Sequence, residues 1–139
     1  MEIEIHLPPQ KLNLQEKQLI DIVKNVSAHI DLKADSIACI FVDDKFLADM
    51  HGHYLADPDK TDVITFNLGD DTVEGEIYIS YERAFEQAAA FNVSFEEEVT
   101  RLVIHGLLHL AGYDDLLEPD RIKMKNAENE LLNTHFHHI

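Results

Sequence analysis

The stretch HGLLHLAGYDD, residues 105–115, places two histidines four residues apart in an otherwise apolar run. Side chains with this spacing in an α-helix project from one face, one turn apart. His105 and His109 therefore present two imidazoles side by side. The residues around them are apolar on nearly every side, which is typical of a buried helix. Gly112 tolerates the left-handed backbone that often ends a helix, so the chain can reverse there.

A buried imidazole needs a polar partner, and the pattern allows two interpretations. In the first, both histidines are core residues hydrogen-bonded to backbone groups or carboxylates. In the second, they bind one metal ion through ring nitrogens at about 2.0–2.1 Å. Asp115 follows His109 by six residues, where a returning loop can offer a carboxylate to the same ion. The histidines, Gly112 and Asp115 together favour the metal site.

The spacing H-x3-H-x2-G-x2-D also matches the zinc-ligand rhythm of metzincin-like peptidases. Those enzymes place a catalytic glutamate directly after the first histidine, and here that position is Gly106. The usual general base of such a peptidase is therefore absent. A metallopeptidase stays open as an alternative, with this residue against it.

The composition is that of one soluble domain. The chain has 139 residues, of which 45% are hydrophobic, and this suits a single globular domain spanning 1–139. The single cysteine, Cys39, has no disulfide partner within the chain. The N-terminus does not resemble a signal peptide, and no apolar run approaches the ~20 residues that span a bilayer. We therefore expect a cytoplasmic protein without a membrane partner.

The charge is strongly acidic, with 27 Asp and Glu against 11 Lys and Arg, a net charge of −16. Such a surface repels phosphates at long range, which argues against general attraction to nucleic acid. A local basic patch is still compatible with it. Arg121, Lys123 and Lys125 cluster in RIKMK, and we interpret them as a solvated helix face.

The remaining sequence predicts an α+β fold. Strands are predicted at 2–7, 36–42, 61–67 and 74–80. Helices are predicted at 14–30, 43–55, 81–91, 95–111 and 120–132. The two close strands at 61–80 suggest an antiparallel hairpin. We expect a single domain with a mixed sheet of about four strands, about five flanking helices and the histidine helix in the core.

Three polar residues mark expected helix starts. Asn13, with Glu16 three residues later, predicts the start of the first helix. Ser80 is expected to cap the third helix. Ser94, with Glu97 three residues later, predicts the start of the histidine helix.

Three motifs resemble one known family. HGLLHLAGYDD closely resembles the signature HGxLHLxGYDH of the YbeY family of ribosomal-RNA maturation factors, which are metal-dependent endoribonucleases. KTDVITF at 60–66 resembles the family's PTDVLSF, and GEIYIS at 75–80 resembles its GDIxIS. The resemblance covers about residues 37–132, and the C-terminal tail 134–139 is expected to be mobile. It implies a mixed sheet flanked by helices and a zinc-dependent endoribonuclease for single-stranded RNA.

The resemblance also implies a set of metal-site residues. His105 and His109 are zinc ligands in a site that holds one Zn²⁺ per chain. Asp115 stands where the family usually has a third histidine, and a carboxylate is a legitimate zinc ligand. Asp114 matches the family's aspartate and is expected, with Gly112, to orient a histidine or the turn.

The residues expected to bind the substrate differ from the family's pattern. The family generally carries an arginine where this chain has Leu55, and leucine cannot grip a phosphate. Lys60 is expected to supply a point charge instead, and Arg101 is expected to help hold the substrate. Glu76 is a candidate general base, although an outward-facing sheet residue is the simpler interpretation.

The resemblance implies partners as well. The first partner is ribosomal RNA, near the 3′ end of the small-subunit RNA. The second is the small ribosomal subunit or its proteins. The implied processes are RNA maturation and ribosome quality control. Leu55 supports a further alternative, a non-catalytic assembly factor in which zinc only clamps the helix to the following loop.

Overall fold

The computed structural model describes residues 1–55, 62–114 and 116–137, and for 51–55 it describes the backbone alone. The strands are β1 (Glu2–His6), β2 (Ala34–Val42), β3 (Val63–Asn67) and β4 (Val73–Ser80). The helices are α1 (Glu16–His29), α2 (Asp44–Leu55), α3 (Tyr81–Ala90), α4 (Phe95–Leu110) and α5 (Glu118–His135). This order confirms the predicted succession of strands and helices.

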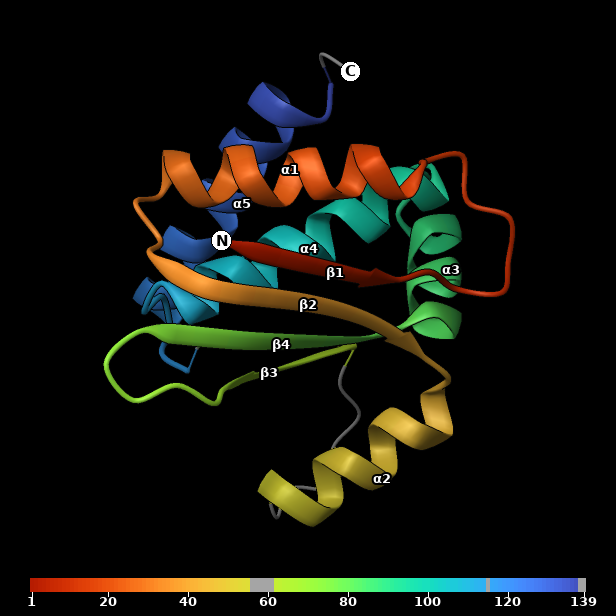
Figure 1. Ribbon diagram of the computed structural model, residues 1–139. Coiled ribbons are helices and arrows are strands. Elements are labelled where there is room, and N and C mark those ends of the chain that lie inside the picture. The colour runs from red at the N-terminus through yellow and green to blue at the C-terminus, as the bar shows by residue number, and fades with distance from the viewer. Residues whose placement is uncertain (56–61, 115, 138–139) are drawn as a thin grey trace.

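The four strands form one mixed sheet in the order β1-β2-β4-β3. The pairs β1–β2 and β2–β4 are parallel, whereas β3 returns antiparallel to β4 and forms one edge. The predicted hairpin is therefore confirmed. Figure 1 shows α1, α3, α4 and α5 grouped together and α2 standing apart from them. The predicted α+β class, with a mixed sheet and five helices, is confirmed.

The larger core lies between the sheet and the four grouped helices. Alternate residues of β2 and β4 point into it, including Ile37, Cys39 and Ile77, all at most 1% exposed. Burial raises the pKa of the Cys39 thiol to about 12, which makes this side chain a neutral core residue. No helix of the described residues is long and apolar enough to span a membrane.

Helix α4 lies directly on β4 at two glycines. A Cβ on Gly106 would lie 2.6 Å from Ile77 Cγ2, and a Cβ on Gly75 would lie 2.5 Å from Leu110 Cδ1. Both distances are far inside van der Waals contact. At Gly106 the buried Ile77 leaves no room for a side chain, whereas at Gly75 the end of the partly exposed Leu110 side chain can move aside. The position of α4 against the sheet is therefore fixed along its C-terminal half.

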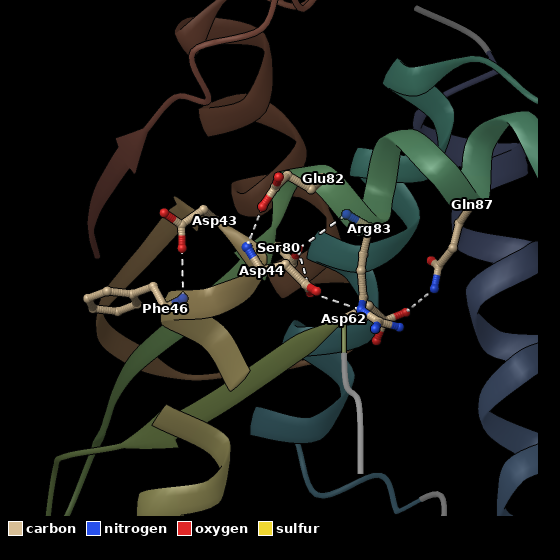
Figure 2. A network of polar contacts seen from close by, with 8 residues as sticks. All are labelled: Asp43, Asp44, Phe46, Asp62, Ser80, Glu82, Arg83 and Gln87. Atoms are coloured by element: carbon tan, nitrogen blue, oxygen red, sulfur yellow. Dashed lines mark hydrogen bonds and ion pairs between the residues drawn. The ribbon is translucent and has the colours of Figure 1, made fainter. Parts of the chain in front are cut away.

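A second, smaller core covers the other face of the sheet. Leu47 of α2 and Ile64 of β3 are buried there. Polar contacts hold the start of α2, as Figure 2 shows: Phe46 N donates to Asp43 Oδ1 at 2.7 Å, and Arg83 Nε donates to Asp44 Oδ1 at 2.9 Å. Helix α2 is thus tied to α3 across the end of β4.

Two of the three predicted helix starts are confirmed. The Ser80 hydroxyl accepts from Arg83 N at 3.2 Å, and the Ser94 hydroxyl accepts from Glu97 N at 3.0 Å. The prediction for Asn13 is wrong. Helix α1 begins at Glu16 with Gln15 as its N-cap, while Asn13 N donates to Glu96 Oε2 of α4 at 2.8 Å. A contact with a distant helix replaced the local cap.

The last helix is longer than its pattern predicted. Helix α5 continues through His135, and Phe136 packs partly buried against the core. His137 Nε2 lies 3.0 Å from Glu97 Oε1 of α4. The boundary expected for a tail at residue 134 is therefore corrected, because the helix and these contacts extend beyond it. Residues 138–139 lie outside the described residues.

Candidate metal centre

The two histidines of α4 converge on one point. His105 Nε2 and His109 Nε2 lie 3.0 Å apart, with ring centroids 4.6 Å apart and planes at 76°. Two nitrogens bound tetrahedrally to one zinc ion lie about 3.3 Å apart, given zinc–nitrogen distances of 2.0–2.1 Å. The spacing of the pair therefore fits a shared metal ion with only a small adjustment of the side chains.

A glutamate of α5 lies directly behind His105. His105 Nδ1 donates to Glu128 Oε2 at 2.6 Å. This bond places the ring proton on Nδ1 and leaves the Nε2 lone pair directed toward His109. A carboxylate behind a ligating imidazole, which fixes the tautomer and raises ligand basicity, is the usual companion of a protein zinc site.

Arg101 keeps Glu128 ionised and in place. Its Nη1 donates to Glu128 Oε1 at 3.1 Å, and its Nη2 donates to Asn129 Oδ1 at 2.8 Å. Burial raises the pKa of Glu128, but the hydrogen bonds and charges of His105 and Arg101 outweigh it, so that pKa lies below its usual range. The guanidinium of Arg101 thus has partners within the protein, and its expected role in holding substrate stays a prediction.

Two of the predicted residues lie outside the described residues, namely Asp115 and Lys60, and so does the side chain of Leu55. In the part of the chain that the structure describes, no three His, Cys, Asp or Glu side chains converge as a metal site. The contribution of Asp115 as third ligand, like that of zinc itself, stays a prediction.

The turn that leads to Asp115 has the expected construction. Gly112 follows the end of α4 with φ of +101°, a conformation that favours glycine. The carboxylate of Asp114 accepts from Leu116 N at 2.7 Å across residue 115. Asp114 therefore acts on the turn, as its predicted role in orienting that turn requires.

Glu76 does not belong to this centre. It alternates with Ile77 along β4, so it points to the face of the sheet opposite α4. Its Oε1 accepts from the Tyr78 hydroxyl at 3.0 Å. The prediction of Glu76 as a general base is corrected, because the sheet separates it from the histidines.

The structure also bears on the peptidase alternative. Gly106 faces β4, and even a methyl group there would collide with Ile77. A catalytic glutamate at this position would point into the core, away from the histidine pair. The arrangement therefore gives a peptidase mechanism no base at the place where such enzymes carry it.

A cavity of about 280 Å³ opens beside His105, between α3, α4 and α5. Glu98 lines it and is only 3% exposed. Burial is the largest influence on the pKa of this carboxyl and raises it to about 7. Sequence reasoning missed both Glu98 and Glu128. Glu98 had a signal, since it lies on the same helix face as Arg101 and His105, at spacings of three and seven residues.

Comparison with known proteins points to one family. A family model described as Endoribonuclease YbeY matches residues 4–135. The chain is 41% identical over 120 residues to an Endoribonuclease YbeY of Flavobacterium psychrophilum, covering 85% of each chain. It is 35% identical over 137 residues to the one of Chlorobium luteolum, covering 98% and 99%. The solution structure of TM1509 from Thermotoga maritima superimposes with a TM-score of 0.59 and 27% identity over 95% and 90% of the two chains.

Proposed function

The chain belongs to the YbeY family of endoribonucleases, and from this premise we propose that it is a zinc-dependent enzyme for single-stranded RNA. Its task is the maturation of ribosomal RNA at the 3′ end of the small-subunit RNA, together with ribosome quality control. The single observation that supports zinc binding is the distance of 3.0 Å between the Nε2 atoms of His105 and His109, together with the hydrogen bond from His105 to Glu128.

The residues divide the chemistry among them. His105 and His109 would hold one zinc ion with Asp115 as the third ligand. When bound, such an ion lowers the pKa of a coordinated water toward ~7 and neutralises charge on phosphoryl oxygens. Glu128 orients His105, and Arg101 orients Glu128. Lys60 supplies a positive charge to the phosphate.

The acidic surface suggests how the enzyme meets its substrate. With a net charge of −16, the chain repels RNA at long range and binds it weakly by itself. We propose that the small ribosomal subunit or one of its proteins, in the cytoplasm, brings the RNA to the site. Tight autonomous binding with a steep salt dependence would contradict this recruitment.

The test uses the purified full chain with a single-stranded RNA, a duplex RNA and a peptide library. We expect one zinc per chain by elemental analysis, cleavage of the single strand only, loss of cleavage with a chelator and recovery with added zinc. Asp115→Ala should lower the zinc content, and full retention would remove Asp115 from the ligand set. Cleavage of peptides but not RNA would establish the peptidase instead.

A second candidate, a zinc-stabilised assembly factor without catalysis, is favoured by Leu55 in place of the family's arginine. It would be established if the zinc-loaded wild type cut no RNA while His109→Ala unfolded the protein.

A further inference from the structure

The cavity beside His105 has the features of a nucleotide subsite. It is bounded by α3, α4 and α5, holds about 280 Å³ and shares His105 with the candidate metal centre. We propose that it binds the nucleotide next to the scissile phosphodiester, with the phosphate at α5 and the base inside. This inference rests on the proposed function and assigns to it the residues that position RNA.

Two cations stand at the α5 side of the cavity. Arg121 and Lys125 line it four residues apart, so they project from one face of the helix. Both are exposed, and within the described residues neither has a carboxylate at ion-pair distance. Arg83 and Arg101, by contrast, are each paired with a carboxylate. The charge of Lys125 acts on Glu98 in the same cavity, but neither cation is held in an ion pair by the described part of the chain, so both can approach a phosphate, which an arginine can bind in bidentate fashion.

An exposed aromatic ring stands on the α3 side. Phe91, the C-cap residue of α3, lines the same cavity and is 63% exposed. An apolar ring left in solvent beside free cations is the usual construction of a site for single-stranded nucleic acid, where bases stack on the ring and cations follow the backbone. Phe91 is therefore the stacking surface of the subsite.

The interior of the cavity determines the orientation of the nucleotide. Asp62 lines it with a carboxylate, and Gln87 Nε2 donates to Asp62 Oδ2 at 3.1 Å, as Figure 2 shows. Glu98 also lines it, and because burial raises its pKa to about 7, this carboxyl is partly protonated at neutral pH. The Asp62 carboxylate repels a phosphate but can accept a hydrogen bond from the amino group of a base, such as N4 of cytosine. The phosphate therefore lies at Arg121 and Lys125, and the base that enters carries an amino group, which excludes uracil as the preferred occupant.

The first test measures binding of labelled single-stranded RNA pentamers to the zinc-loaded full chain, by fluorescence anisotropy over a salt series. The variant is the double change Arg121→Gln with Lys125→Gln. The control is Lys17→Gln with Lys24→Gln, two exposed lysines on α1 that do not line the cavity and whose loss changes the net charge equally. We expect about tenfold weaker binding for the α5 variant only, with unchanged zinc content. Its salt slope should fall by about 1.4, as two lost phosphate contacts on a single strand require.

Each other outcome has a distinct meaning. Equal losses in both double variants, no loss in either, or no binding by the wild type would overturn the subsite. If the wild type bound RNA through Arg121 and Lys125 yet cut none, the proposed nuclease function would fail while the binding subsite stood.

The second test examines the aromatic ring and the base. We expect Phe91→Ala to weaken pentamer binding about 5- to 100-fold, as loss of one base stack does, and Phe91→Trp to restore it. Phe85→Ala, another exposed phenylalanine of α3 that does not line the cavity, is the control. A cytidine pentamer should bind at least about fivefold better than a uridine pentamer. Equal binding of the two pentamers would overturn the proposed orientation of the base, and equal effects of Phe91→Ala and Phe85→Ala would overturn the stacking.

Discussion

The molecule contains two histidine pairs with nearly the same local geometry. His105 and His109 approach to 3.0 Å between nitrogens, and so do His29 Nδ1 and His135 Nε2. Both pairs meet edge to face, with ring centroids 4.6 Å and 5.2 Å apart. By nitrogen spacing alone, either pair could bind a metal ion.

Their surroundings differ in two ways. The first pair stands on a single helix held against β4, and Glu128 fixes the tautomer of one ring. The second pair joins the end of α1 to the end of α5, and among the described residues it has no carboxylate partner. A rigid spacing and an ionised group behind the ring, rather than nitrogen distance, therefore distinguish a candidate metal centre from a simple contact between two imidazoles.

The largest expected effect separates the two pairs directly. His109→Ala removes one of the ligands, so we expect zinc affinity to fall by about two orders of magnitude or more. His29→Ala should leave the zinc content at one per chain. Elemental analysis after dialysis against a weak chelator measures both. Equal zinc in the two variants, or loss in His29→Ala alone, would reverse the assignment.

A smaller effect is expected when the carboxylate behind His105 is neutralised. Glu128→Gln keeps the shape of the side chain but weakens its hold on the Nδ1 proton, so zinc affinity should fall by about 10- to 100-fold. The matched control is Glu130→Gln, an exposed glutamate of the same helix. Competition with a chromogenic chelator gives both affinities. The claim that Glu128 distinguishes the pairs fails if both variants bind zinc like the wild type.

The close packing of α4, which carries the first pair, against the sheet can be tested by adding a single methyl group. Gly106→Ala places a Cβ against Ile77 and should lower the free energy of unfolding by about 1–3 kcal/mol, because the helix must move away from β4. Urea denaturation of the zinc-free protein measures the change. A variant as stable as the wild type would show that α4 is free to shift, and the rigidity attributed to the pair would be lost.

The smallest effect concerns the second pair and pH. Burial, followed by the nearby charge of His29, lowers the pKa of His135 below its ordinary value of 6.5. The unfolded chain therefore binds this proton more readily, and stability declines as pH falls below 6.5 toward the lower folded pKa. Above pH 7.5, the melting temperature of His135→Gln should change with pH as that of the wild type does. Below pH 6.5, the variant should lose less stability than the wild type as the pH falls. Parallel curves for the two zinc-free proteins would contradict the shift.

Local patterns predicted most of the fold. The alternation in EIEIH, the apolar run of β2 and the hydroxyl caps Ser80 and Ser94 depend on neighbours in the chain, and each was found where the sequence placed it. The failures involve distant partners. Asn13 lost its expected capping role to a contact with Glu96, and α5 extended past its pattern where Phe136 reaches the core.

The same division holds for the candidate site. The sequence by itself determined that His105 and His109 share a face, since a four-residue spacing fixes two side chains on any α-helix. Only the tertiary structure brought Glu128 behind His105, turned Glu76 to the far side of the sheet, and set Arg121 and Lys125 opposite Phe91. These relations join residues far apart in the chain, and they depend on how the helices pack on the sheet rather than on any local backbone rule.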